Sequence, residues 1–123
     1  MRTFPTRAAV LSAAAFMLVA GPALAHPKLL KATPAANATV KAPARIELHF
    51  SETLEPKFST ATLTMPEHGG MSVTVAAAVD PKDRKTLVVT PKGPLMAGAY
   101  AVNWAVTSTD THKVNGVHSF KIG

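Results

Sequence analysis

The sequence predicts an all-β fold, a single small Greek-key β-barrel or sandwich of about seven strands. Apolar and polar residues alternate with a period of two in short runs from residue 45 to the C-terminus, as in half-buried antiparallel strands. The prolines from Pro34 to Pro94 all fall between these runs, where a missing N–H does least harm. No segment keeps a helical period over the roughly ten residues that a helix needs.

The expected strands follow one another closely along the chain. The first lies near residues 28–32, and the others cover 46–50, 60–65, 71–77, 87–89, 100–107 and 118–122. We expect their inward side chains to form one core, in which the large aromatic residues supply much of the stability. These aromatic residues are Phe50, Phe58, Trp104 and Phe120.

Composition excludes several classes of protein. A chain of 123 residues with 47% hydrophobic and 16% charged residues is one globular domain rather than a disordered segment. The absence of cysteine excludes disulfides, thiolate zinc sites, iron–sulfur clusters and a cysteine nucleophile. A bound metal would therefore use nitrogen, oxygen or thioether ligands. The basic residues are scattered without interleaved aromatic residues, so we expect no nucleic-acid binding.

The first 25 residues have the layout of a secretory signal peptide. Two arginines precede an apolar run from residue 8 to 20, and Ala23-Leu24-Ala25 forms a small-residue cleavage site. We expect cleavage after Ala25, which leaves residues 26–123 as the mature domain. An exported domain without cysteine suits the bacterial periplasm, and we expect a monomer there.

Cleavage after Ala25 would make His26 the first residue, with an α-amine and an imidazole nitrogen that can chelate one metal. Pro27 has no backbone N–H, so a second-residue amide cannot join the chelate. Asp110 and His112 share the parity of the strand that carries Trp104, and an extended chain would project both past the core. Three nitrogens and one oxygen favour Cu(II).

Simpler roles exist for each of these residues. Asp110 could cap a turn, His112 could be a surface residue, and His26 could be a frayed terminus. We favour the metal site because cleavage, the proline and the Asp-x-His spacing coincide.

A second candidate site lies in the segment from residue 65 to 71. Met65, His68 and Met71 are soft ligands suited to Cu(I). Alternatively, both methionines keep the inward parity of their neighbours and cap the core. Of the remaining histidines, we expect His49 on the surface and His118 packed and hydrogen-bonded.

Short motifs are spread along residues 26–123. They are His26-Pro27-Lys28-Leu29, Thr33-Pro34-Ala35, Ile46-Glu47-Leu48-His49-Phe50-Ser51-Glu52, Ala97-Gly98-Ala99-Tyr100, Trp104, Ser108-Thr109-Asp110-Thr111-His112 and Gly116. Together they resemble the periplasmic copper-resistance protein CopC family over nearly the whole mature chain.

The resemblance implies a small Greek-key β-barrel that binds copper without turning over a substrate. It implies His26, Asp110 and His112 as the Cu(II) ligands, with Glu52 beside them. Members that bind Cu(I) carry a longer and more methionine-rich loop than the segment with Met65, His68 and Met71. The implied partners are an inner-membrane copper transporter or a periplasmic multicopper oxidase.

Two other functions remain open. An N-terminal histidine also occurs in copper monooxygenases, and a sandwich can be a metal-free, immunoglobulin-like interaction module. Stoichiometric Cu(II) uptake would exclude the module, and ascorbate-driven oxidation of a glycan would distinguish the enzyme from the carrier.

Overall fold

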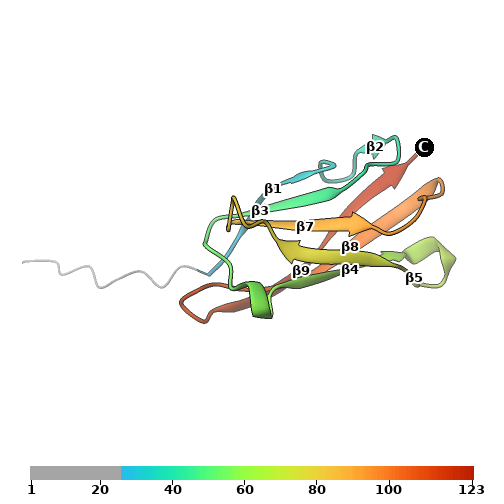
Figure 1. The fold of residues 1–123 in the computed structure, drawn as a ribbon. Coiled ribbons are helices and arrows are strands. Elements are labelled where there is room, and N and C mark those ends of the chain that lie inside the picture. The colour runs from blue at the N-terminus through green and yellow to red at the C-terminus, as the bar shows by residue number, and fades with distance from the viewer. Residues whose placement is uncertain (1–25) are drawn as a thin grey trace, which may run out of the picture.

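The computed structural model describes residues 26–123, so the signal peptide expected over residues 1–25 and its cleavage after Ala25 lie outside the described residues. The described part forms an open sandwich of two sheets, with only two short 3₁₀ turns besides the strands. In this part of the chain, no helix is long and apolar enough to cross a membrane. Figure 1 shows the strands running along the length of the sandwich.

Four strands form one sheet in the order β1-β3-β7-β6, and five form the other in the order β2-β9-β8-β4-β5. The first sheet contains β1 (Leu29–Thr33), β3 (Ile46–Phe50), β6 (Val75–Val79) and β7 (Thr86–Pro91). The second contains β2 (Thr39–Val40), β4 (Thr60–Met65), β5 (Met71–Val73), β8 (Gly98–Thr107) and β9 (Lys113–Ile122). The 3₁₀ turns are η1 (Pro56–Phe58) and η2 (Pro66–His68).

The chain crosses between the sheets five times, at β1–β2, β2–β3, β3–β4, β5–β6 and β7–β8. The all-β fold is therefore confirmed as a two-sheet sandwich. Long antiparallel pairing of β8 with β9, from Gly98 opposite Ile122 to Thr107 opposite Lys113, forms the centre of the larger sheet.

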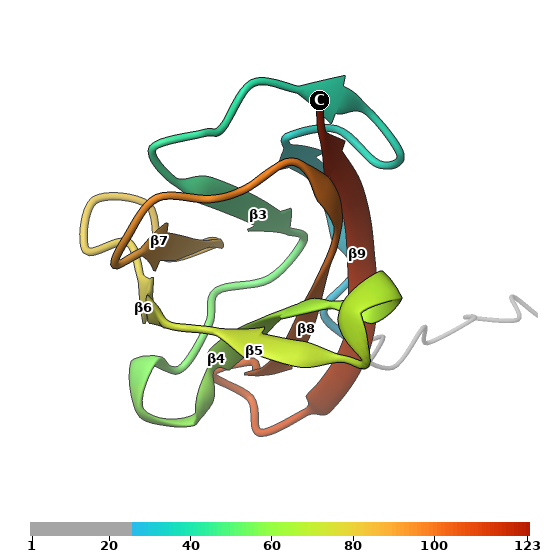
Figure 2. The ribbon, with the colours of Figure 1, turned by 90° about the vertical axis from the view of Figure 1, so that its right-hand side faces the viewer.

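The expected strand over 71–77 is wrong in one respect, because it is two strands in different sheets. β5 pairs with β4, whereas β6 pairs with β7. The chain turns the corner at Thr74, whose carbonyl accepts a hydrogen bond from the Lys92 N–H. Figure 2 shows β5 running directly into β6 at this corner. The short β2, which pairs in parallel with β9, was not predicted from the sequence.

The core between the sheets contains most of the inward residues that alternation predicts. Tyr100 and Phe120 stack with ring centroids 5.6 Å apart, and Phe50 meets Trp104 edge-on at 5.0 Å. Phe58 was expected in the core, but it is 64% exposed. It lies in η1 rather than on a strand, so the period-two pattern does not decide which way it points.

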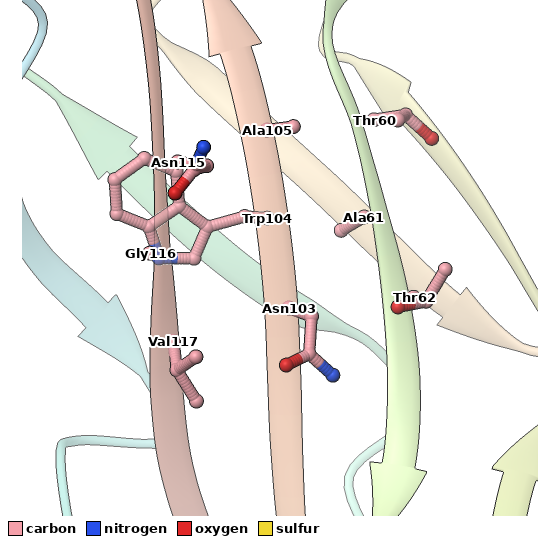
Figure 3. Close-up of a pocket in the computed structure, with 9 residues that line it drawn as sticks. All are labelled: Thr60, Ala61, Thr62, Asn103, Trp104, Ala105, Asn115, Gly116 and Val117. Atoms are coloured by element: carbon pink, nitrogen blue, oxygen red, sulfur yellow. The ribbon is translucent and has the colours of Figure 1, made fainter.

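The indole of Trp104 occupies space that only a glycine leaves free. Trp104 and Gly116 are directly opposite on β8 and β9, and a Cβ at residue 116 would lie 2.8 Å from Cε2 of the indole. Figure 3 shows the ring lying across β9 at Gly116, beside a shallow hollow of about 410 Å³. The missing side chain thus lets a large aromatic residue fill the core between Phe50 and β9.

We predict that Gly116→Ala lowers the free energy of unfolding by about 1–3 kcal/mol, because the added methyl group must displace a packed indole. Urea unfolding followed by Trp104 fluorescence measures the change. Gly93→Ala is the control, since no atom lies within 4 Å of a Cβ built there. Equal stability of the two variants would contradict the packing described here.

Candidate metal centre

Three segments meet at one end of the sandwich: the start of the described chain, the segment 51–55 that follows β3, and the β8–β9 turn. Figure 1 shows the first residues after the grey trace and the β8–β9 turn at the same end, with the β4–β5 turn at the other. The expected ligands His26, Asp110 and His112 therefore lie at a different end from Met65, His68 and Met71.

Asp110 and His112 come together through a turn, not through the extended strand that the sequence analysis assumed. β8 ends at Thr107, and the Ser108 N–H then bonds the His112 carbonyl at 2.9 Å. Thr111 adopts a φ of 73° and donates its N–H to the Ser108 carbonyl. The turn places Oδ2 of Asp110 3.4 Å from Nδ1 of His112, closer than two side chains on one extended strand would lie.

The carboxylate of Asp110 is held in its charged form. The Ser108 hydroxyl donates a hydrogen bond to Oδ1 of Asp110, and this bond is the main reason that the pKa of Asp110 lies below its ordinary value. The neighbouring His112 acts in the same direction, while partial burial opposes both. Asp110 is therefore available as an anionic oxygen ligand well below neutral pH.

His112 also contacts the start of the described chain. Its ring centroid lies 4.8 Å from that of His26, and the two rings are inclined at 59°. The Nδ1 atom of His112 is shielded from solvent, and its contact with Oδ2 of Asp110 at 3.4 Å does not have the geometry of a hydrogen bond. Leaving a buried polar atom unpaired costs about 1–3 kcal/mol. A metal ion held between these side chains would supply the missing partner.

His112 contacts His26 on one side and Asp110 on the other. Within residues 26–123, the His, Asp and Glu side chains do not form a ready group of three metal ligands. Any metal held here would therefore need a donor beyond these side chains.

The segment 51–55 holds the two halves of this centre together. On one side, Ser51 exchanges two hydrogen bonds of 2.9 Å with Lys28, one through its hydroxyl and one through its N–H. On the other side, Thr53 accepts the Thr109 N–H at 3.0 Å and Leu54 forms a β-bridge with Ser108. The half-buried Glu52 lies between these two sets of bonds.

Ser51 and Ser108 are the residues that the sequence analysis missed. The signal for Ser108 was present, because a serine two positions before an aspartate commonly forms a side-chain bond within a turn. Asp110 also has the turn role considered for it, because it accepts the Ser108 hydroxyl within the turn. This role is compatible with its position next to His112.

The residues of the second candidate site differ sharply in exposure. Met65 is 1% exposed and packs against Gly98, whereas its cross-strand partner Met71 is 45% exposed. His68 is exposed in η2. The alternative role in the core is therefore correct for Met65 and wrong for Met71, which lies at the edge of the sheet.

Two more histidines, His49 and His118, have hydrogen-bond contacts with residues outside the candidate centre. His118 is buried and its Nε2 lies 2.8 Å from the Pro34 carbonyl, as expected. His49 was expected on the surface, but it is half-buried and its Nδ1 lies 2.8 Å from the Thr86 hydroxyl. That hydroxyl donates to Asp83, so Nδ1 of His49 is the donor in its contact.

Comparison with known proteins gives consistent results. A family model described as the CopC domain matches residues 29–123. Copper resistance protein C of Pseudomonas syringae pv. tomato is 49% identical over 114 residues, which cover 89% of this chain and 90% of that protein. Copper resistance protein C of Escherichia coli is 44% identical over 119 residues, which cover 93% and 94%.

A solved structure shares the fold. The crystal structure of PcoC, described as a methionine-rich copper resistance protein from Escherichia coli, superposes with a TM-score of 0.74 at 42% identity. The superposition covers 80% of this chain and all of that one. The resemblance carried by the sequence motifs is thereby confirmed.

Proposed function

The chain belongs to the CopC family, and on that premise we propose that it is a periplasmic copper carrier that holds Cu(II) without turning over a substrate. The observation that carries the proposal is the contact of His26 with His112, which in turn contacts Asp110. The first described residue and the β8–β9 turn thus meet at His112, whose Nδ1 is shielded from solvent.

Export completes the proposed donor set. Removal of residues 1–25 would give His26 a free α-amine, which can close a chelate ring with the imidazole of the same residue. Pro27 cannot supply an amide nitrogen, so the remaining positions fall to His112 and Asp110. Two imidazoles, one amine and one carboxylate suit the tetragonal coordination of Cu(II).

We propose that Glu52 supports this site without binding the metal. Its neighbours Ser51 and Thr53 accept bonds from the N-terminal segment and from the β8–β9 turn, respectively. Glu52 therefore lies in the segment that joins the two halves of the candidate site, and its negative charge there would favour a bound dication.

The proposed donor set argues for a carrier rather than a copper enzyme. A metal that activates oxygen or a substrate keeps an open position, whereas Asp110 here would occupy the fourth. We propose that the copper is exchanged with an inner-membrane copper transporter or a periplasmic multicopper oxidase.

The first prediction concerns the N-terminal amine. One extra Gly before His26 in the processed protein keeps every side chain but converts the α-amine of His26 into an amide. We expect Cu(II) affinity to fall at least about a hundredfold, which is about 2.7 kcal/mol. Competition titration measures the affinity, and electron paramagnetic resonance counts the nitrogen ligands.

Two substitutions complete this experiment. His112→Ala on the native terminus should also weaken Cu(II) binding, whereas His49→Ala should not, because His49 bonds to Thr86 away from the centre. Should the extended protein bind Cu(II) as tightly as the processed one, with the same nitrogen count, the proposed site is wrong.

The second prediction concerns pH. Imidazole and α-amino groups lose their protons at about pH 6.5 and about pH 7.7–8 in model peptides, and they must do so to bind a metal. We expect Cu(II) affinity to fall steeply from pH 7 to pH 5. Asp110 should not contribute to this fall, because its lowered pKa keeps it ionised over that range. A titration series that gives a constant affinity would exclude nitrogen ligands.

The third prediction separates the two methionines of the β4–β5 turn. We propose that Cu(I) binding at this end uses Met71 and His68, which solvent reaches, and not the buried Met65. Met71→Leu should abolish Cu(I) binding in a competition assay. Met65→Leu should leave it unchanged and cost under about 1.5 kcal/mol of stability, as volume-conserving exchanges in a core do. The reverse pattern would place the Cu(I) ligand inside the core.

A further inference from the structure

One buried hydroxyl touches both residues that the β8–β9 turn contributes to the centre. Ser108 is 2% exposed, and its hydroxyl donates a hydrogen bond to Oδ1 of Asp110. The same oxygen accepts the backbone N–H of His112 at 3.2 Å. A single side chain thus connects the carboxylate and the imidazole-bearing residue.

We propose that Ser108 is the positioning residue of the copper site, and that its hydroxyl sets the geometry between Asp110 and His112 before the metal arrives. The inference rests on the proposed function of the centre. Ser108 itself binds no metal, because its hydroxyl is already engaged with both residues.

The assignment of the two carboxylate oxygens supports this role. Oδ1 of Asp110 is engaged by Ser108, while Oδ2 lies 3.4 Å from Nδ1 of His112. The side chain of Asp110 is 51% exposed, so few packing contacts restrict its rotation. The bond from Ser108 therefore selects the rotamer that presents one oxygen to the shared space beside His112.

Ser108 is itself fixed by its backbone. Its N–H bonds the His112 carbonyl, its carbonyl accepts the Thr111 N–H, and it forms a β-bridge with Leu54. A rigid hydroxyl that orients ligands lowers the entropy lost on binding. Hydrogen-bonding partners of metal ligands typically contribute about 10–100-fold in metal affinity.

The test compares two buried serines at the same end of the sandwich. Ser108→Ala should weaken Cu(II) binding by about 10–100-fold and change the electron paramagnetic resonance spectrum. Ser59→Ala is the matched control, because Ser59 is also buried and bonds the backbone of Thr107 without contact to Asp110 or His112. It should alter stability but leave both the affinity and the spectrum unchanged.

A double-mutant cycle identifies the residue through which Ser108 acts. In an Asp110→Ala background, Ser108→Ala should cost much less affinity than it does in the native protein. An equal cost in both backgrounds would overturn the inference, as would a Ser108→Ala protein that binds like the native one or loses no more than Ser59→Ala.

A second pair of variants covers the case in which Ser108→Ala fails to fold. Threonine and valine at residue 108 have nearly the same volume. Both add a methyl group at Cβ, but Ser108→Thr keeps the hydroxyl and Ser108→Val replaces it by a second methyl group. The threonine variant should bind Cu(II) at least about tenfold more tightly than the valine variant, and equal affinities would overturn the inference. Failure of the native protein to bind Cu(II) through nitrogen would instead overturn the proposed function, on which the inference rests.

Discussion

The arrangement of the candidate metal centre depends on the backbone hydrogen bonds of the segment 51–55. This segment leaves β3 in one sheet and bonds to the end of β8 in the other, where the Glu55 N–H meets the Thr107 carbonyl at 2.7 Å. On its opposite side it pairs with Lys28, two residues after His26. Backbone bonds have fixed positions along a chain, so one short segment sets the distance between the N-terminus and the β8–β9 turn.

The core contact next to this segment keeps it in place. Phe50 immediately precedes the segment and meets Trp104 edge-on, and Trp104 lies four positions before Ser108 on the same strand. Gly116 admits the indole into this space. The contact between Phe50 and Trp104 therefore helps to hold the end of the sandwich that carries the candidate ligands. A change in this contact would shift those ligands through the segment after Phe50 and through the end of β8.

The strands and their buried faces could be predicted from the alternation of apolar and polar residues, whereas the turns that depend on single backbone angles could not. The strands over 46–50 and 60–65 follow from their inward residues, and the packed state of His118 follows from its parity with Phe120. The corner at Thr74 was not visible, because the alternation continues through it while the pairing partner changes. The turn after Thr107 depends on the positive φ of Thr111, which no periodicity signals. The exposure of Phe58 and the partial burial of His49 likewise depend on which residues pack beside them, which alternation does not indicate.

If His26 binds copper as proposed, its position against His112 has a consequence for where in the cell the protein could acquire the metal. Under the proposed function, one of the donors is created by the protease that removes the leader, so the precursor in the cytosol lacks a complete site. Newly made chains would then not withdraw copper from the enzymes and regulators of that compartment. Removal of the leader would then be the step that makes Cu(II) binding possible, and it would take place only after export across the inner membrane.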